Sequence, residues 1–441
     1  MSSVLPLRST SVPGVSARSR NLLQLRRETR DPIGFLQHVA SQGDVAEFSL
    51  GARRAFLVSH PEQIERVLIT DQAKFSKPPA LERTARLLGR GLLTSDAALN
   101  MTRRRVIAPV FHREQMTRYA GIIVSHASGR AARWTDGDSV DIADEMTTLA
   151  LRVVGECLFS ADLETSTGEI RDLLRTAVEA LDPLVVLVSP MRRLRPVRDR
   201  LHALVREMIA RQIADPHDNL LRLLLDARGP EATPEQLLDD ALTMLLAGHD
   251  TIANALTWTW QWMSDTPDAA ARFRAELTEA LDGRAPSADD LPRLRYTRAV
   301  LAEALRLSPP AWVLARRALE DHRCGGVVIP RGSLVIMSPY LVHRDARFHP
   351  DPLSFRPERW LADAAPRPRL AFFPFGAGRR SCIGEGFAWM EGVLVLATVG
   401  QRWRLVSTGP TREFDPRITL RPRGPQMMRV ERIAPAESDV D

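Results

Sequence analysis

Residues 375–384 read Phe-Gly-Ala-Gly-Arg-Arg-Ser-Cys-Ile-Gly. They place Cys382 in a glycine-rich loop immediately before an apolar stretch that predicts a helix over residues 384–401. A helix N-terminus offers partial positive charge and free N–H groups, which favour a thiolate over a thiol. Gly378 and Gly384 can adopt backbone angles that other residues resist, so the loop can turn its amides toward the sulfur. We therefore expect the Cys382 sulfur to be an anion.

The neighbours of this cysteine favour a ligand role for it. Phe375 can cover the sulfur from water, and Arg380 offers a planar fork for a carboxylate. The chain has only two other cysteines, Cys157 and Cys324, and no C-x-x-C pair. This spacing argues against a disulfide framework, an iron–sulfur cluster or a zinc ribbon. Cys382 is expected to act alone, although a buried structural thiol is the default interpretation of an isolated cysteine.

The segment resembles the haem-binding signature F-x-x-G-x-R-x-C-x-G of the cytochromes P-450 and fits all five of its fixed positions. The resemblance implies a haem b whose iron is bound by Cys382, with Arg380 on a haem propionate. Cys382-Ile-Gly-x-x-Phe-Ala is similar to the soluble bacterial branch of the family. Two further propionate contacts are implied, by Arg104 and Arg316. Asn100 stands where the family usually has Trp or His, but its amide can still donate a hydrogen bond.

Two segments upstream of the cysteine loop resemble the family's E-x-x-R helix and its P-E-R-W segment. On a helix Glu303 and Arg306 share one face, and Arg359 can complete a three-member ion-pair network. Such a network is expected to brace the cysteine loop from behind. By itself E-x-x-R is a common surface pair, and only its position upstream of Cys382 gives it weight.

Ala247-Gly248-His249-Asp250-Thr251 resembles the family's oxygen-activation motif in the middle of a long helix. Gly248 permits the close approach of a flat cofactor, while the Thr251 hydroxyl and the Asp250 carboxylate can relay protons through water. The alternative is a helix kink with a solvated aspartate. His249 occupies a variable position of the motif and has no assigned role.

The predicted fold is mainly α with small β-sheets. Apolar residues recur at helical spacing over residues 114–283, and strands are expected at 45–51, 55–59, 334–337, 418–420 and 427–430. The resemblance implies the cytochrome P-450 fold, a triangular helical prism with a small β lobe. The expected organisation is a loosely ordered segment (1–30), a single catalytic domain (31–435) and a C-terminal tail (436–441).

The resemblance implies a monooxygenase that inserts one oxygen atom of dioxygen into a hydrophobic small molecule. The segments expected to contact that molecule are apolar, so we expect a hydrophobic substrate. The Asp250 motif and the sequence from Cys382 to Ala388 are similar to the bacterial branch that oxidises terpenes, polyketides or fatty acids, which implies a terpenoid or another natural-product intermediate. The candidate pocket residues are Leu92, Leu93, Leu246, Trp312 and Val313. Two alternatives remain. One is a peroxygenase or oxidative-coupling enzyme, against which Asp250 and Thr251 argue, and the other is a non-catalytic haem electron carrier or sensor, against which the apolar segments argue.

Composition and charge restrict the partners. No flavin or nicotinamide motif is present, so electrons are expected from a ferredoxin or flavodoxin with its reductase. The net charge is +6, and Arg379, Arg103, Arg105 and Arg113 could offer positive potential near Cys382. Acidic residues are interspersed along the chain, which argues against nucleic-acid binding. No apolar run is long enough for a membrane span and no secretory signal is evident, so we expect a cytoplasmic monomer.

Overall fold

The structure is a computed structural model, and its description covers residues 31–50, 53–79, 81, 84–85, 89–161, 167–180, 195–226, 234–361, 366–409 and 413–433. The expected N-terminal segment 1–30 and the tail 436–441 lie outside the described residues. Among the described residues, no helix is both long and apolar enough to cross a membrane.

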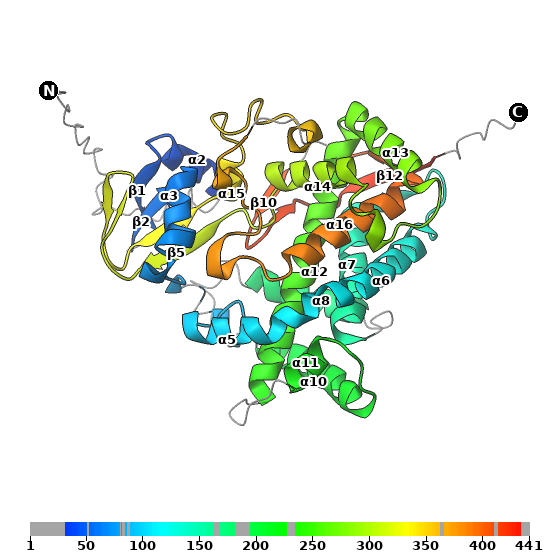
Figure 1. Cartoon of the computed structure of the whole chain (residues 1–441), viewed down its shortest axis with the longest axis horizontal. Coiled ribbons are helices and arrows are strands. Elements are labelled where there is room, and N and C mark those ends of the chain that lie inside the picture. The colour runs from blue at the N-terminus through cyan, green and yellow to red at the C-terminus, as the bar shows by residue number, and fades with distance from the viewer. Residues whose placement is uncertain are drawn as a thin grey trace, which may run out of the picture.

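Helices form the larger part of the molecule, as the sequence predicted (Figure 1). The body consists of α6 (Arg113–Ala131), α7 (Ile142–Phe159), α8 (Thr167–Ala180), α10 (Arg195–Ala214), α11 (Leu220–Asp226), α12 (Pro234–Ser264), α13 (Pro267–Leu281), α14 (Arg295–Leu307) and α16 (Glu385–Gly400). The 31 residues of α12 span about 46 Å at 1.5 Å per residue. This helix packs against α7, α10, α14 and α16. It therefore forms the central axis of the body.

A five-stranded sheet forms a smaller lobe with the short helices α2 (Pro32–Ala40), α3 (Pro61–Glu65) and α15 (Pro339–Val342) (Figure 1). Its strand order is β1-β2-β8-β5-β3, in which β2 and β8 are parallel and the other neighbours antiparallel. The strands are β1 (Val45–Leu50), β2 (Arg53–Val58), β3 (Phe75–Ser76), β5 (Leu314–Ala318) and β8 (Leu334–Met337). The predicted strands at 45–51, 55–59 and 334–337 are confirmed within two residues.

Three smaller sheets complete the β structure. One joins β4 (Ser139–Asp141), β12 (Met427–Arg432) and β9 (Trp403–Ser407), one pairs β6 (His322–Cys324) with β7 (Val327–Ile329), and one pairs β10 (Phe414–Pro416) with β11 (Leu420–Pro422). The strand expected at 418–420 was wrong in its bounds, because residues 417–419 form the bend of the β10–β11 hairpin. The indole N–H of Trp258 donates to the Leu420 carbonyl (3.0 Å). This bond ties the hairpin to α12.

The helix α5 (Ala97–Ile107) connects the lobe to the body. Its N-terminus is capped by Asp96, whose carboxylate accepts the Leu99 N–H at 2.9 Å. Short helical turns occur at Arg66–Thr70 (η1), Gln72–Lys74 (η2), Ala108–Phe111 (η3), Ala288–Asp290 (η5), Pro357–Trp360 (η6), Arg369–Ala371 (η7) and Gly378–Arg380 (η8).

The core of the body encloses one carboxyl group that has no charged partner. Glu391 on α16 is 1% exposed, and neither of its carboxyl oxygens has a hydrogen-bond partner among the described residues. Burial raises the pKa of Glu391 well above its usual value. The folded protein therefore keeps this proton at pH values where the unfolded chain has lost it.

We expect the Glu391 carboxyl to lower stability as pH rises. Because the pKa of Glu391 is raised in the folded state, the protonated carboxyl contributes its full share of the unfolding free energy below the unfolded pKa of about 4.3. As pH rises from there toward the folded pKa, the unfolding free energy falls by about 1.4 kcal/mol per pH unit. Glu391→Gln should flatten the dependence of the unfolding free energy on pH between 5 and 7, measured by urea denaturation. Glu47→Gln, at an exposed position, is the control. Equal slopes in wild type and Glu391→Gln would contradict the expectation.

Candidate haem-thiolate site

The loop that carries Cys382 is closed by its own backbone and attached to the β lobe. The Cys382 N–H donates to the Phe375 carbonyl at 2.8 Å. The single helical turn η8 within the loop is held from outside, because the Arg379 N–H donates to the side-chain oxygen of Gln72 (2.9 Å). The loop is therefore fixed at both its ends and its middle.

Two glycines have backbone angles that the loop requires. Gly376 and Gly378 both have φ +70°, in the left-handed region that favours glycine. A Cβ at Gly378 would lie 1.9 Å from the Leu68 carbonyl oxygen, so this glycine also permits close approach to η1. The prediction for Gly384 was wrong, because its φ of −92° suits any residue. The positive φ expected at Gly384 is found at Gly376 instead.

The surroundings of the Cys382 sulfur do not by themselves produce a thiolate. Although the residue is exposed by surface area, the protein atoms packed around its sulfur desolvate it and raise the pKa of Cys382, which outweighs the lowering by the Gly384 N–H and by Arg104. The helix N-terminus and the loop amides therefore do not make the sulfur an anion without a metal ion, and the role of Cys382 as an iron ligand stays a prediction. Cys382 is an exposed residue, and a metal ion that binds a thiol deprotonates it outright. Arg104 lies beside the sulfur, donating from Nη1 to the Ser381 carbonyl at 2.7 Å.

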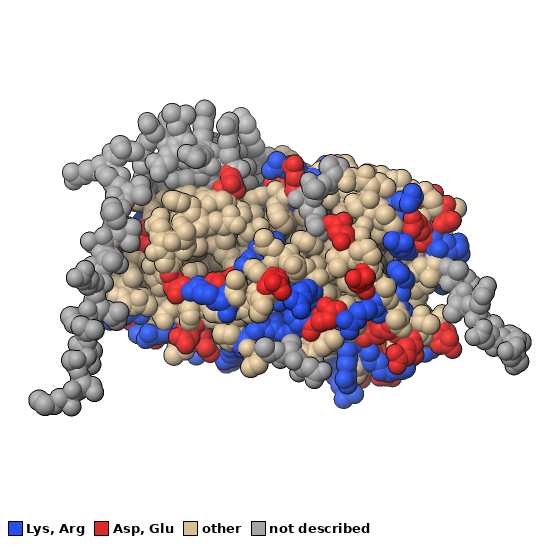
Figure 2. Space-filling model, turned by 90° about the horizontal axis from the view of Figure 1, so that it is seen from above, with Lys and Arg blue, Asp and Glu red and all other residues tan. Residues whose placement is uncertain are grey.

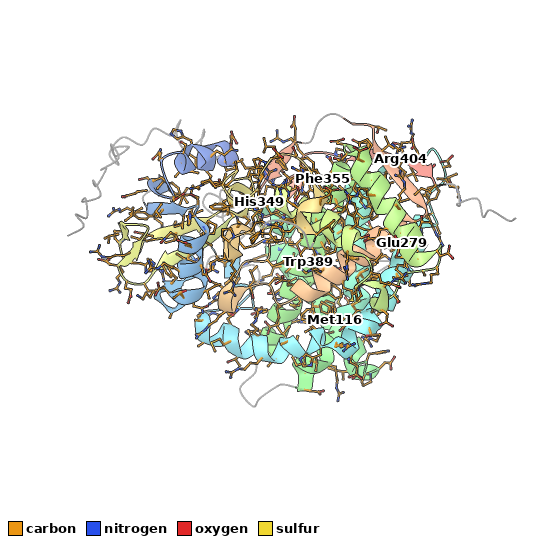
Figure 3. All side chains as sticks on the ribbon, turned by 45° about the horizontal axis from the view of Figure 1, so that its top comes forward. Met116, Glu279, His349, Phe355, Trp389 and Arg404 are labelled. Atoms are coloured by element: carbon orange, nitrogen blue, oxygen red, sulfur yellow. The ribbon has the colours of Figure 1, made fainter. Side chains whose placement is uncertain are left out.

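Phe375 packs on the helix that follows the loop. Its ring centroid is 5.5 Å from that of Trp389, which projects from α16 (Figure 3). The guanidinium of Arg298 on α14 lies 4.1 Å from the centre of the Trp389 ring. Phe375 therefore belongs to a packed aromatic layer that shields one side of the loop.

Glu303 is the centre of a buried hydrogen-bond network. Its carboxylate accepts two bonds from Arg306 (2.7 and 2.9 Å), one from Arg359 (2.9 Å) and one from the Trp360 indole (2.8 Å). Both Glu303 and Arg306 have fully buried side chains. Burial raises the pKa of Glu303, but Arg306 and Arg359 lower it further, so its net pKa lies below the usual value. Glu303, Arg306 and Arg359, which the sequence predicted to form an ion-pair network, therefore meet at the Glu303 carboxylate.

A short chain of hydrogen bonds leads from this network to the cysteine loop. Arg306 donates to the His343 carbonyl (2.8 Å), and the His343 ring accepts the Phe373 N–H at 2.9 Å. Burial lowers the pKa of His343 well below its usual value, so the ring is neutral. The Gly376 N–H donates in turn to the Phe373 carbonyl (3.0 Å). His343 is thus the link that sequence reasoning missed.

The predicted oxygen-activation residues lie in the middle of α12. The Thr251 hydroxyl donates to the Ala247 carbonyl at 2.9 Å, and Ala247 is exposed, whereas Leu246 before it is buried and Gly248 after it is half-buried. The role proposed for Gly248 needs correction, because its Cα faces α7: an added Cβ would lie 3.0 Å from a Val154 methyl. Gly248 permits close packing of two helices and not the approach of a cofactor. His249 is buried and its Nδ1 is 2.8 Å from the Leu245 carbonyl.

Asp250 has two partners that the sequence did not suggest. Its carboxylate accepts from Arg421 Nη2 (2.5 Å) and from the Thr419 hydroxyl (2.8 Å), both on the β10–β11 hairpin. The solvated-aspartate alternative is therefore wrong. These partners are about 170 residues away in the chain, and no local pattern marks them. Only the docking of the hairpin on α12 brings them together.

Five cationic residues line one cavity of about 330 Å³, and Asp96 is the one carboxylate among the described residues that line it. Three of the five, Lys77, Arg316 and Arg380, form a cation cluster whose charges interact, and the other two are Arg90 and Arg379. Burial and the two arginines lower the pKa of Lys77 to about 7, and burial and Arg380 lower the pKa of Arg316 to about 10. Cations that depress each other's pKa in a cavity favour the binding of an anion.

This cation cluster is what a cofactor with two carboxylates requires, so the residues present fit a haem. Arg316 and Arg380, which the sequence analysis proposed as propionate contacts, both line this cavity. Lys77 was missed, because neither it nor Lys74, the other lysine of this arginine-rich sequence, belongs to a motif. Asn100 also lines the cavity, but its side-chain amide donates to the Leu92 carbonyl at 2.7 Å.

The candidate pocket residues divide into two groups. Leu93 is exposed, and Leu92 and Val313 are half-buried. Trp312 packs within the lobe, where its indole donates to the Arg417 carbonyl (2.7 Å). Leu246 is buried in the body core. Trp312 and Leu246 therefore both pack in a hydrophobic core, and their place in a substrate pocket stays a prediction.

The proposed basic docking cluster also needs correction. Arg103 is buried and forms an ion pair with Asp240, so it cannot offer its charge to a partner. Arg105, Arg113 and Arg379 are exposed. On the face drawn in Figure 2, basic and acidic side chains intermingle among the coloured residues.

Comparison with known proteins agrees with this geometry. The chain matches the cytochrome P450 family over residues 18–429. It is 36% identical to cyclooctatin synthase of Streptomyces melanosporofaciens, over 95% of this chain and 93% of that protein. It is also 36% identical to cyclooctat-9-en-7-ol 5-monooxygenase of the same organism, over 85% of each chain. Pentalenene oxygenase of Streptomyces avermitilis is 33% identical, over 85% of this chain and 87% of that protein.

The family match covers the cysteine loop, the buried glutamate network and the central helix alike. Relatives named as a monooxygenase and an oxygenase, together with the family match, make this protein an enzyme. The chain belongs to the cytochrome P450 family of oxidoreductases.

Proposed function

We propose that Cys382 is the axial thiolate ligand of a haem b and that the protein inserts one oxygen atom of dioxygen into a hydrophobic small molecule. The observation that carries the proposal is the cation cluster of Lys77, Arg316 and Arg380 near the fixed loop of Cys382. Bound haem supplies the oxygen chemistry, because a thiolate ligand favours cleavage of the O–O bond. Arg104, which contacts the loop, is proposed to assist the cation cluster in holding the propionates.

The residues of the chain have three tasks in this proposal. The Glu303 network and His343 keep the cysteine loop in place through their hydrogen bonds. Phe375, packed on Trp389, covers one side of the cysteine loop and would limit the access of water from that side. Thr251 and Asp250 supply a hydroxyl and a carboxylate that would hold and pass protons to the bound group.

Two features support a terpenoid substrate. Leu93 is exposed and Val313 half-buried, which suits an apolar ligand. The relatives are named for cyclooctatin, cyclooctat-9-en-7-ol and pentalenene. We infer that this enzyme acts on a molecule of the same general class. A screen of terpene hydrocarbons tests this inference, because a substrate that displaces iron-bound water changes the haem spectrum. A panel of fatty acids that binds better than every terpene would contradict it.

We propose that electrons come from a separate acidic ferredoxin or flavodoxin with its reductase, and that the enzyme is a monomer. Arg379 lies in the cysteine loop itself, and Arg105 lies on α5, whose Arg104 contacts that loop. Positive potential there would attract an acidic partner, and the attraction should weaken with salt.

Replacing Thr251 is expected to separate oxygen consumption from product formation. Thr251→Ala removes the hydroxyl that can position a proton donor, so we expect about 100-fold less product per oxygen consumed, with peroxide released instead. Product, oxygen and peroxide are measured in one assay. Thr257→Ala is the matched control, because Thr257 makes the same bond to the carbonyl four residues earlier in α12 (2.8 Å). Equal product yields from the two variants would contradict the role of Thr251.

A further inference from the structure

A second cavity, of about 270 Å³, lies between the C-terminal end of α12, the first turns of α13 and the strand β9. It also reaches Gly400, the last residue of α16, and this helix of 16 residues spans about 24 Å from the end of the cysteine loop. In Figure 1, α13 lies at the end of the body away from the β lobe. The second cavity shares no lining residue with the cavity of the cation cluster. It is therefore separate from the site of Cys382.

The wall of the second cavity is largely apolar and aromatic. Its large apolar side chains are Trp260, Met263, Phe273, Trp403 and Leu405. The rings of Trp260 and Phe273 meet edge to face, with centroids 6.3 Å apart. The indole N–H of Trp260 is buried and has no hydrogen-bond partner among the described residues. The wall therefore offers aromatic surface and contains one donor that the described protein leaves without an acceptor.

Two arginines supply the cationic groups of this cavity. Arg274 on α13 is half-buried, and Arg404 on β9, labelled in Figure 3, is 50% exposed. Burial lowers the pKa of Arg274, and the charge of Arg404 lowers it further. Among the described residues no carboxylate pairs with Arg274, and Arg404 has a long contact of 3.7 Å with Glu431, which Arg429 contacts at 2.6 Å. The two guanidinium groups therefore repel each other with little compensation.

The charges that line the cavity favour a ligand with one negative charge. Asp268 is the one carboxylate among the described lining residues, so two arginines and one aspartate give a net charge of +1. Asp268 lies in the first turn of α13, where the helix N-terminus stabilises a negative side chain. A single carboxylate would neutralise the remaining charge, and a guanidinium binds a carboxylate through two parallel hydrogen bonds.

The volume and the wall restrict the apolar part of the ligand. Pockets for drug-sized ligands measure roughly 300–1,000 Å³, so a cavity of about 270 Å³ suits a smaller molecule. Aromatic walls favour an aromatic ring, which packs on them edge to face or offset. One ring with a short acidic arm therefore fits both the size and the charge of the cavity.

We propose that this cavity is a second ligand site, which binds a small aromatic monocarboxylate between Arg274 and Arg404. The ring of the ligand lies against Trp260 and Phe273, and its carboxylate accepts hydrogen bonds from the two guanidinium groups. The site lies at the far ends of α12, which carries Thr251, and of α16, which follows the cysteine loop. The inference does not depend on the proposed function, because a ligand there does not reach the cysteine loop.

Calorimetric titration of the haem-loaded enzyme with phenylacetate tests the site. We expect saturable binding with one molecule per chain and no change in the haem spectrum. Phenylacetamide has the same ring without the charge, and acetate has the charge without the ring. Each should bind about tenfold more weakly or less, because each lacks one of the two interactions that the cavity offers.

The matched variants each remove one guanidinium group. Arg274→Gln and Arg404→Gln should each weaken phenylacetate about tenfold, the loss expected for a charge-assisted bond, and leave the weak binding of phenylacetamide unchanged. Arg175→Gln is the control, because Arg175 is 63% exposed on α8, outside the cavity. Arg274→Gln should also raise the midpoint of thermal unfolding without ligand, since it removes the repulsion between the two arginines.

Each of several results would overturn the inference. They are the absence of saturable binding of phenylacetate at millimolar concentrations, equal affinity for phenylacetamide, and equal affinity of wild type and both arginine variants. A change in the haem spectrum that follows the binding curve would place phenylacetate at the iron and overturn it as well. A wild type without a thiolate spectrum contradicts the proposed function alone, because the titration with phenylacetate still decides on the second site.

Discussion

Cys382→Ala is expected to abolish the red-shifted Soret band of the reduced, carbon-monoxide-treated protein and to remove all oxygen insertion. Cys382 is the only cysteine of the three that is exposed, and its loop is fixed by backbone bonds whether or not the sulfur is present. The change should therefore remove a ligand without unfolding the loop. Absorption spectra with carbon monoxide and product analysis measure the two effects.

Cys324→Ala serves as the control for this prediction. Cys324 is buried in the β lobe, where burial raises the pKa of its thiol to about 11. Its loss should cost about 1 to 2 kcal/mol of stability through packing and leave the band unchanged. If the band persists in Cys382→Ala, the ligand assignment is wrong, and if it disappears in Cys324→Ala at full folding, the assignment is not specific to Cys382.

Glu303→Ala is expected to lower the free energy of unfolding by about 3 to 5 kcal/mol and to impair haem retention. The substitution leaves Arg306 buried with its charge uncompensated, which is the most costly way to break a buried pair. It also releases Arg359 and Trp360, which donate to the same carboxylate. Guanidinium denaturation measures stability, and the ratio of haem absorbance to protein absorbance measures retention.

The matched control for Glu303 is an exposed pair of the same chemistry. Glu47 accepts from Arg54 at 2.7 Å, but the two side chains are 48% and 56% exposed. Glu47→Ala should therefore cost less than about 1 kcal/mol, since solvent screens the pair. Equal losses from the two alanine variants would show that the Glu303 network does not brace the molecule. Haem retention separates a local effect on the loop from a general loss of stability.

Features within one short segment were predictable, because spacing determines which side chains share a helix face. Glu303 and Arg306 are three residues apart and meet through two hydrogen bonds, as an α-helix requires. The loop before α16 was also predictable, since glycines and an apolar run mark a turn followed by a helix. The sequence did not show which glycines of the loop have a positive φ: Gly376 has one, and Gly384 does not.

Contacts between distant segments were not predictable. Arg421 is paired with Asp250, Arg103 with Asp240, and Lys77 lies beside Arg316 and Arg380. A charged side chain has a wide choice of partners in a chain with 60 basic and 54 acidic residues. Burial selects among them, and burial is known only once the helices have packed.

The sequence by itself determined the family, the candidate iron ligand and the residues of the buried network, because these depend on fixed local spacing. Only the tertiary structure decided how the cysteine loop is held, which arginines are buried and which cations face the cavity. It also joined residues 89–95 to α12, across about 150 residues of chain. The physical reason is that long-range hydrogen bonds and desolvation depend on distances that folding alone creates.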